Sequence, residues 1–205
     1  LRVVTDVAGV GALAVVKANG YGHGALPVAR ALVEAGVVGL GVSQVAEALA
    51  LREGGITAPV TAWLHVPDTD FEAAIAGGVD IAVSSPRQLD AVVDAAARRG
   101  EPATLTVKVD TGMNRSGVGW AEWEVFIEAF ARAHAAGAVA LRGVMAHLAC
   151  SDEPDHPAND AQAAGLRAAV ADLAAVGGVP ELVHLANSPA ALTRPDLAFD
   201  AVRPG

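Results

Sequence analysis

The sequence predicts an α/β fold, a (β/α)8 TIM-type barrel, because eight short apolar segments alternate with amphipathic Ala-rich segments along the chain. The apolar segments are rich in Val, Leu and Ile. Several are apolar without alternation, as expected of parallel strands buried on both faces. Their starts recur at about 26 residues, the size of one βα unit. Eight units in series favour the barrel over the alternative, an open doubly wound sheet.

The expected strands are, in order, residues 13–16, 38–42, 60–64, 81–83, 104–109, 141–146, 182–185 and 199–202. The expected helices are 27–35, 44–52, 71–76, 86–98, 120–136, 161–176 and a short one at 188–192. Residue types at the boundaries agree with these elements. Pro27 and Pro86 suit first helical turns, and Ser43 and Ser85 suit N-caps. A glycine follows most of the helical segments, where a left-handed residue is favoured.

Composition narrows the classes of function. The chain has 205 residues, with 14 Lys and Arg against 23 Asp and Glu, and a net charge of −9. This balance argues against nucleic acid or an anionic membrane surface as a partner. Mean hydropathy is high, at +0.40. However, the sequence has no uncharged apolar run of about 20 residues, the length that a membrane-spanning helix needs. One cysteine cannot form an internal disulfide, and we expect a cytoplasmic protein.

Polar side chains gather where the expected strands end. In parallel barrels these carboxyl ends share one rim, and active sites lie there. No comparable set appears at the opposite ends of the strands, and this asymmetry indicates an active site. The residues concerned are Lys17, Asn19, Tyr21, Trp63, His65, Ser84, Ser85, Lys108, Asp110, Asn114, Arg115, His147, Asn187, Ser188, Arg203 and Gly205.

The residue types at this rim favour some chemistries over others. A lysine such as Lys17, directly after a strand and before a Gly-rich loop, suits Schiff-base formation with a carbonyl. The histidines are scattered without HxH or HExxH spacing, so we expect no metal. No GxSxG or GxGxxG segment is present. For some of these residues a purely structural role stays open. Trp63 could pack in the core, and Lys108 could form an ion pair with Asp110. The acidic segment 152–157 could be a loop exposed to solvent.

Five segments resemble the alanine racemase family. The longest, residues 14–24 (AVVKANGYGHG), resembles the family's pyridoxal-phosphate lysine signature. The others are 108–115 (KVDTGMNR), 143–147 (GVMAH), 184–188 (HLANS) and 202–205 (VRPG), in the family's order and spread over essentially the whole chain. The resemblance implies a barrel followed by a C-terminal β domain, in a head-to-tail homodimer.

The resemblance also implies a cofactor, pyridoxal 5′-phosphate, and a role for each matching residue. Lys17 would bind the cofactor as a Schiff base and transfer a proton on one face of the substrate Cα. Arg115 would contact the cofactor oxygen and the substrate carboxylate, and His147 would support the acid–base network. Lys108 would be carbamylated and would orient Arg115. The remaining implied cofactor-binding residues are Tyr21, Trp63, Asn187, Ser188, Arg203 and Gly205.

The activity implied is interconversion of L-alanine and D-alanine, supplying D-alanine for peptidoglycan. Racemisation needs a group on each face of Cα, and the resemblance implies a tyrosine from the partner subunit's C-terminal domain as the second. We therefore expect residues 1–205 to be the cofactor-binding barrel of a longer protein, with a preceding strand and helix and a following β domain outside this chain, and little activity in the barrel alone. The alternatives are a non-catalytic pyridoxal-phosphate carrier and a related enzyme acting on another amino acid.

Overall fold

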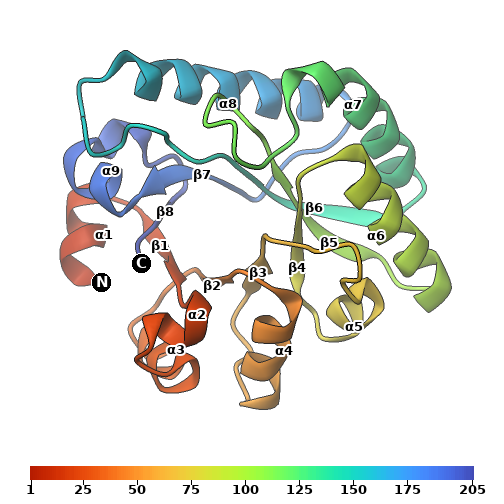
Figure 1. The fold of residues 1–205 in the computed structure, drawn as a ribbon, viewed down its shortest axis with the longest axis horizontal. Helices are drawn as coiled ribbons and strands as arrows, with labels where there is room; N and C mark the ends of the chain where they lie inside the picture. Colours follow the sequence, from red (N-terminus) through yellow and green to blue (C-terminus); the bar gives the residue numbers. More distant parts are fainter.

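The computed structural model describes residues 1–205. Its eight strands form a closed parallel barrel with helices around it (Figure 1). Each strand pairs with the next, and β8 pairs with β1 to close the ring. The predicted (β/α)8 barrel is therefore confirmed. The strands are β1 (Gly11–Val15), β2 (Gly39–Val42), β3 (Val60–Ala62), β4 (Asp80–Val83), β5 (Ala103–Lys108), β6 (Val139–Met145), β7 (Leu182–Asn187) and β8 (Ala201–Arg203).

The helices follow the strands as expected, with three additions. Helices α1 (Arg2–Ala8) and α2 (Lys17–Tyr21) and the 3-10 helix η1 (Pro195–Leu197) are absent from the sequence-based prediction. The remaining helices are α3 (Ala25–Glu34), α4 (Val45–Glu53), α5 (Phe71–Ala76), α6 (Pro86–Arg99), α7 (Trp120–Ala135), α8 (Pro157–Ala175) and α9 (Ser188–Thr193). None of them combines the length and apolarity that crossing a lipid bilayer requires.

Burial on both faces explains why apolar and polar residues do not alternate along several strands. Every residue of β2, β3 and β4 is buried, because one face lines the barrel and the other meets the helices. The expected third strand, 60–64, ends earlier, at Ala62. A Cβ added to Gly41 of β2 would lie 2.2 Å from the ring of Trp63. The missing side chain of Gly41 therefore makes room for the Trp63 indole at the carboxyl end of the barrel.

A buried carboxylate sits at the opposite end of the barrel. Asp80 is the first residue of β4, and its Oδ2 accepts hydrogen bonds from the hydroxyls of Thr61 (2.7 Å) and Thr106 (2.8 Å). Its Oδ1 has no partner, and Arg142 Nε lies 4.0 Å from Oδ2. Burial raises the pKa of Asp80 from the usual 3.8 to about 6, against the opposing effect of the two hydroxyls.

This raised pKa predicts a pH-dependent difference between the wild type and Asp80→Asn. Since the folded pKa is above the unfolded one, the stability that Asp80 contributes is present below pH 4 and is lost as pH rises through 6. Relative to Asp80→Asn, the wild type should lose about 2 kcal/mol of unfolding free energy between pH 4 and pH 7. Urea denaturation of both proteins at several pH values measures this difference, and parallel pH profiles would contradict it.

Candidate active site

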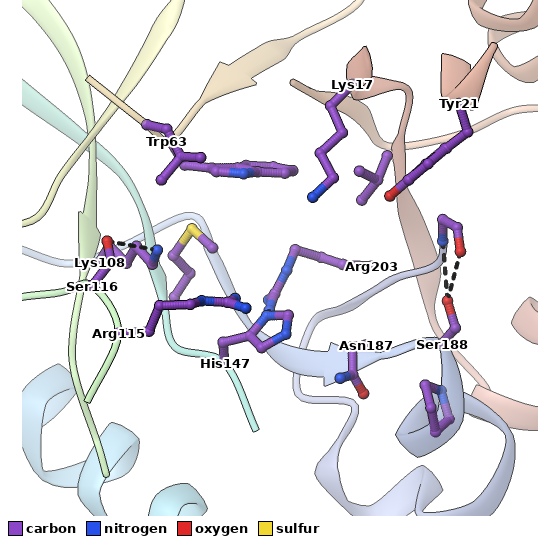
Figure 2. A pocket seen from close by; sticks show the side chains of 15 residues that line it. Lys17, Tyr21, Trp63, Lys108, Arg115, Ser116, His147, Asn187, Ser188 and Arg203 are labelled. Carbon is purple, nitrogen blue, oxygen red and sulfur yellow. Dashed lines mark hydrogen bonds between the residues drawn. The ribbon is translucent and has the colours of Figure 1, made fainter. Parts of the chain in front are cut away.

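A cavity of about 580 Å³ opens at the carboxyl ends of the strands (Figure 2). All ten residues that the sequence assigns to a site line it, although they come from six of the eight βα units. They are Lys17, Tyr21, Trp63, Lys108, Arg115, His147, Asn187, Ser188, Arg203 and Gly205. Other rim residues of the wider set do not line it, among them Asn19, His65, Ser84 and Asp110.

Charge is distributed unusually around this cavity. Lys17, Lys108, Arg115 and Arg203 all line it, and no Asp or Glu does, although the whole chain carries a net charge of −9. Cationic side chains confined in a cleft create a positive potential that attracts anions. The cavity therefore favours a ligand that carries negative groups, such as a phosphate or a carboxylate. No group of three or more His, Cys, Asp or Glu is arranged to hold a metal ion.

A short segment of left-handed backbone directly follows Lys17. Ala18 (φ 52°, ψ 47°), Asn19 (55°, 45°) and Gly20 (61°, 40°) are all left-handed, and Tyr21 has a φ of 53°. Such a conformation costs a non-glycine residue roughly 1–2 kcal/mol, so surrounding contacts must hold it. The segment brings Lys17 Nζ to 5.9 Å from the centroid of the Tyr21 ring. Both side chains point into the cavity from the same segment (Figure 2).

Hydroxyl and backbone N–H groups meet on one side of the cavity. The Gly205 N–H donates to Ser188 Oγ (3.1 Å), and that hydroxyl donates to the Gly205 carbonyl (3.1 Å). A Cβ on Gly205 would lie 2.8 Å from Val15 Cβ and 3.0 Å from the Tyr21 hydroxyl. Only glycine fits there, and its lack of a side chain lets the end of the chain pass close to Val15 and to the Tyr21 hydroxyl at the wall of the cavity. This arrangement suits a phosphate group.

Arg203 makes more hydrogen bonds within the protein than the other three cationic side chains of the cavity. The guanidinium is buried and donates to the carbonyls of Ala146 (2.7 Å), His184 (3.0 Å) and Leu185 (3.1 Å). It also contacts the Nδ1 atoms of His184 (2.7 Å) and His147 (3.3 Å). Burial lowers the pKa of Arg203 to about 10, so the side chain stays charged at neutral pH. The β7–β8 register shifts between His184 and Asn187, where these contacts form.

The contacts of Arg203 determine the protonation state and the tautomer of His147 and His184. Burial, followed by the charge of Arg203, lowers the pKa of His147 to about 3 and that of His184 well below its usual range. Both rings are therefore neutral at pH 7. A guanidinium has donors but no acceptor, so each Nδ1 must accept and each ring carries its proton on Nε2. These contacts engage both terminal nitrogens of Arg203, and its Nε has no protein partner.

Lys108 lies at the end of β5, surrounded by other cations. Its Nζ donates to Ser116 Oγ at 2.9 Å. The sequence analysis does not identify Ser116 as a site residue, although Ser116 directly follows the 108–115 segment. Burial, followed by the charges of Arg115 and Arg203, lowers the pKa of Lys108 to about 8. The alternative of an ion pair with Asp110 is not seen. Asp110 instead accepts hydrogen bonds from the N–H groups of Gly112 and Asn114, both at 3.0 Å.

A buried amide connects the loops that carry Arg115 and His147. Gln162 of α8 accepts from the Ala149 N–H (2.8 Å) and donates to the His147 carbonyl (2.9 Å) and to Thr111 Oγ1 (3.4 Å). Its side chain is one of the few buried polar groups of the chain. No sequence motif identifies Gln162, because its partners lie 13 to 51 residues away.

Known proteins resemble this chain over nearly all of its length. The model of the alanine racemase N-terminal domain matches residues 1–205. The chain is 58% identical to the alanine racemase of Mycolicibacterium vanbaalenii over 194 residues, covering 94% of this chain and 50% of that protein. It is 56% identical to that of Mycolicibacterium smegmatis over 207 residues, covering 100% and 53%. A crystal structure of alanine racemase from D-cycloserine-producing Streptomyces lavendulae superposes with a TM-score of 0.96 at 43% identity, covering 100% and 54%. The chain thus spans about half the length of these proteins.

Proposed function

Because the chain belongs to the alanine racemase family, we propose that its protein binds pyridoxal 5′-phosphate in this cavity and interconverts L-alanine and D-alanine. One observation carries the proposal: a lysine directly before a strained backbone segment lines a cavity that holds four cationic side chains, hydroxyl groups and no carboxylate. A cofactor phosphate and a substrate carboxylate are the anions that such a cavity would bind.

The residues present fit the cofactor. Tyr21, Ser188 and Gly205 line one side of the cavity, where the Ser188 hydroxyl and the Gly205 N–H, which bond to each other in this structure, would turn to the phosphate together with the Tyr21 hydroxyl. Asn187 and Trp63 line the same cavity. The Arg203 Nε has no protein partner and would donate to the ring nitrogen. Lys17 supplies the amine for covalent attachment. When bound, pyridoxal phosphate supplies an electron sink for the charge that forms on Cα.

The chain's own residues then account for one half of the racemisation. Lys17 Nζ would remove a proton from Cα, or return one, on one face. Arg115 would bind the substrate carboxylate with its planar fork. Arg203 would donate a hydrogen bond to the ring nitrogen without releasing a proton, because a guanidinium deprotonates reluctantly. This limits electron withdrawal and favours return of the proton to Cα. His147, neutral, would hold Arg203 in place through its Nδ1.

The second face of Cα requires a group from outside this chain. Tyr21 is the only tyrosine in the sequence, and it lies on the phosphate side of the cavity. We propose that the second acid or base is a tyrosine from the C-terminal β domain of the partner subunit in a homodimer. We also propose that the enzyme acts in the cytoplasm and supplies D-alanine for peptidoglycan.

We further propose that Lys108 is carbamylated. A pKa of about 8 leaves part of the amine neutral at pH 7.5, and a neutral amine adds to CO₂ to give a carbamate and a proton. The resulting anion would lie among the charges of Arg115, Arg203 and Lys17, which otherwise repel the ammonium. We expect intact mass spectrometry at near-neutral pH to show the added CO₂, lost on acidification, and NMR with ¹³C-bicarbonate to show a carbamate carbon. Lys108→Arg should lack both signals, and their absence from the wild type would refute the modification.

An assay of the full-length protein tests the proposed activity. With pyridoxal phosphate present, L-alanine should yield D-alanine, detected with a D-amino acid oxidase, and the reverse reaction should proceed under the same conditions. Parallel assays with L-serine and larger amino acids test whether another substrate is preferred. Cofactor binding without turnover of any amino acid would contradict the proposed activity and favour the carrier alternative.

A further inference from the structure

The Glu47 carboxylate joins two neighbouring βα units at the rim of the cavity. Glu47 lies in the first turn of α4, and its Oε2 accepts from the N–H groups of Ser43 (2.8 Å) and Gln44 (3.0 Å). Its Oε1 accepts from the N–H of Ala18 at 2.7 Å, 29 residues earlier in the chain. Ala18 directly follows Lys17 and is the first residue of the left-handed segment.

A second helix of the same barrel shows what the cap of α4 needs by itself. In α6, Gln88 stands at the position equivalent to Glu47, five residues after the end of its strand. Its Oε1 accepts from the Ser84 N–H at 2.8 Å, as Glu47 Oε2 does from Ser43. There one amide oxygen, together with the Ser85 hydroxyl that accepts from the Gln88 N–H at 3.2 Å, caps the helix start. The second oxygen of Glu47 is additional to the cap, and it is the one that reaches Ala18.

We propose that Glu47 is a positioning residue for Lys17, holding the strained segment that aims the amine into the cavity. Left-handed backbone is unfavourable for Ala18 and Tyr21, so the segment persists only where contacts determine it. A hydrogen bond from an N–H to a carboxylate is among the stronger ones available. It acts on the Lys17–Ala18 peptide, where a change of backbone conformation would displace the lysine. The inference rests on the proposed function, in which Lys17 carries the cofactor.

Glu47→Gln in the full-length protein separates the two roles of this side chain. The glutamine keeps one acceptor for the α4 cap, as Gln88 does in α6, but it cannot accept on both sides. We expect the Ala18 amide to exchange with solvent at least about tenfold faster by NMR or mass spectrometry. We expect kcat to fall by about tenfold with KM within about twofold, because the lysine is displaced while the sites for phosphate and carboxylate stay intact. Appearance of the imine absorbance on addition of pyridoxal phosphate should slow in parallel.

Two further variants exclude a simple effect on folding. Asp70→Ala removes another cap at the same rim, because Asp70 Oδ1 accepts from the Ala73 N–H at the start of α5. It should cost similar stability while leaving Ala18 exchange and imine formation unchanged. Ala18→Gly combined with Glu47→Gln should restore imine formation towards the wild-type rate, because glycine adopts left-handed backbone without strain. Failure of this double variant to recover would contradict the role assigned to strain.

The readouts also separate this inference from the proposed function. If Glu47→Gln leaves Ala18 exchange, imine formation and kcat at the level of Asp70→Ala, Glu47 is only a helix cap and the inference is overturned. If the wild type forms no imine, the proposed function fails instead. Amide exchange at Ala18 does not depend on the cofactor, and it would still decide whether Glu47 holds the segment.

Discussion

Lys17→Ala should abolish covalent attachment of pyridoxal phosphate and lower the rate of alanine racemisation by at least about a thousand-fold. The variant loses the nucleophile that holds the cofactor and the group that moves a proton on one face of Cα, and each role contributes by orders of magnitude. Lys17 lies at the cavity, outside the apolar core, so we expect the barrel to stay folded. The absorbance of the bound cofactor and the interconversion assay measure the two losses.

Lys17→Arg is the matched variant for this prediction. It keeps the positive charge but cannot form a Schiff base, so it should retain some cofactor affinity without the imine absorbance. Circular dichroism and thermal unfolding of both variants show whether the fold is intact. An imine absorbance that persists in Lys17→Ala would mean that another amine carries the cofactor, and within residues 1–205 the only other lysine is Lys108.

Arg203→Leu should lower the unfolding free energy by about 3–5 kcal/mol. The leucine cannot donate, so the buried carbonyls of Ala146 and Leu185 and the His184 Nδ1 lose their partner within the barrel. Buried acceptors without partners carry the full cost of desolvation. Urea denaturation of the wild type and the variant measures the loss. Racemisation should also fall, because the cofactor ring nitrogen would lose the Arg203 Nε as its donor.

Arg194→Leu provides the comparison on the surface. Arg194 also bonds to several groups, including the Pro154 carbonyl (2.7 Å) and the carboxylate of Asp196 (2.7 Å), but its partner Asp196 is largely exposed. Water replaces such contacts when they are lost, so the expected cost is about 1 kcal/mol or less. Equal losses for the two variants would show that the burial of Arg203 does not set its contribution.

The barrel could be predicted because burial on both faces produces apolar segments that are visible in the sequence. Helix α1 could not be predicted in the same way. Its sequence, RVVTDVA, is rich in β-branched residues, which favour strands. It is nevertheless helical, ending at Gly9 in left-handed conformation and packing against α9, which is distant in the sequence. Tertiary contacts outweigh the local preference there.

The composition of the cavity was predictable, but the means of holding it were not. Strand ends share a rim in any parallel barrel, so polar residues that follow strands converge. The left-handed segment after Lys17 gives no such signal, because Ala18 and Tyr21 have no preference for positive φ. The contacts of Glu47 with Ala18 and of Gln162 with Thr111 join residues 29 and 51 positions apart. Only the folded chain brings these pairs together.

Borohydride reduction of the full-length protein loaded with pyridoxal phosphate, followed by peptide mapping, tests whether Lys17 holds the cofactor. Reduction fixes the cofactor to the amine that holds it, and within this chain Lys17 and Lys108 are the only lysines. We expect a pyridoxyl group on the peptide that contains Lys17, and none on the peptide that contains Lys108. A pyridoxyl group on Lys108 would contradict the role assigned to Lys17, and the absence of any pyridoxyl group within residues 1–205 would contradict the assignment of this cavity as the cofactor site.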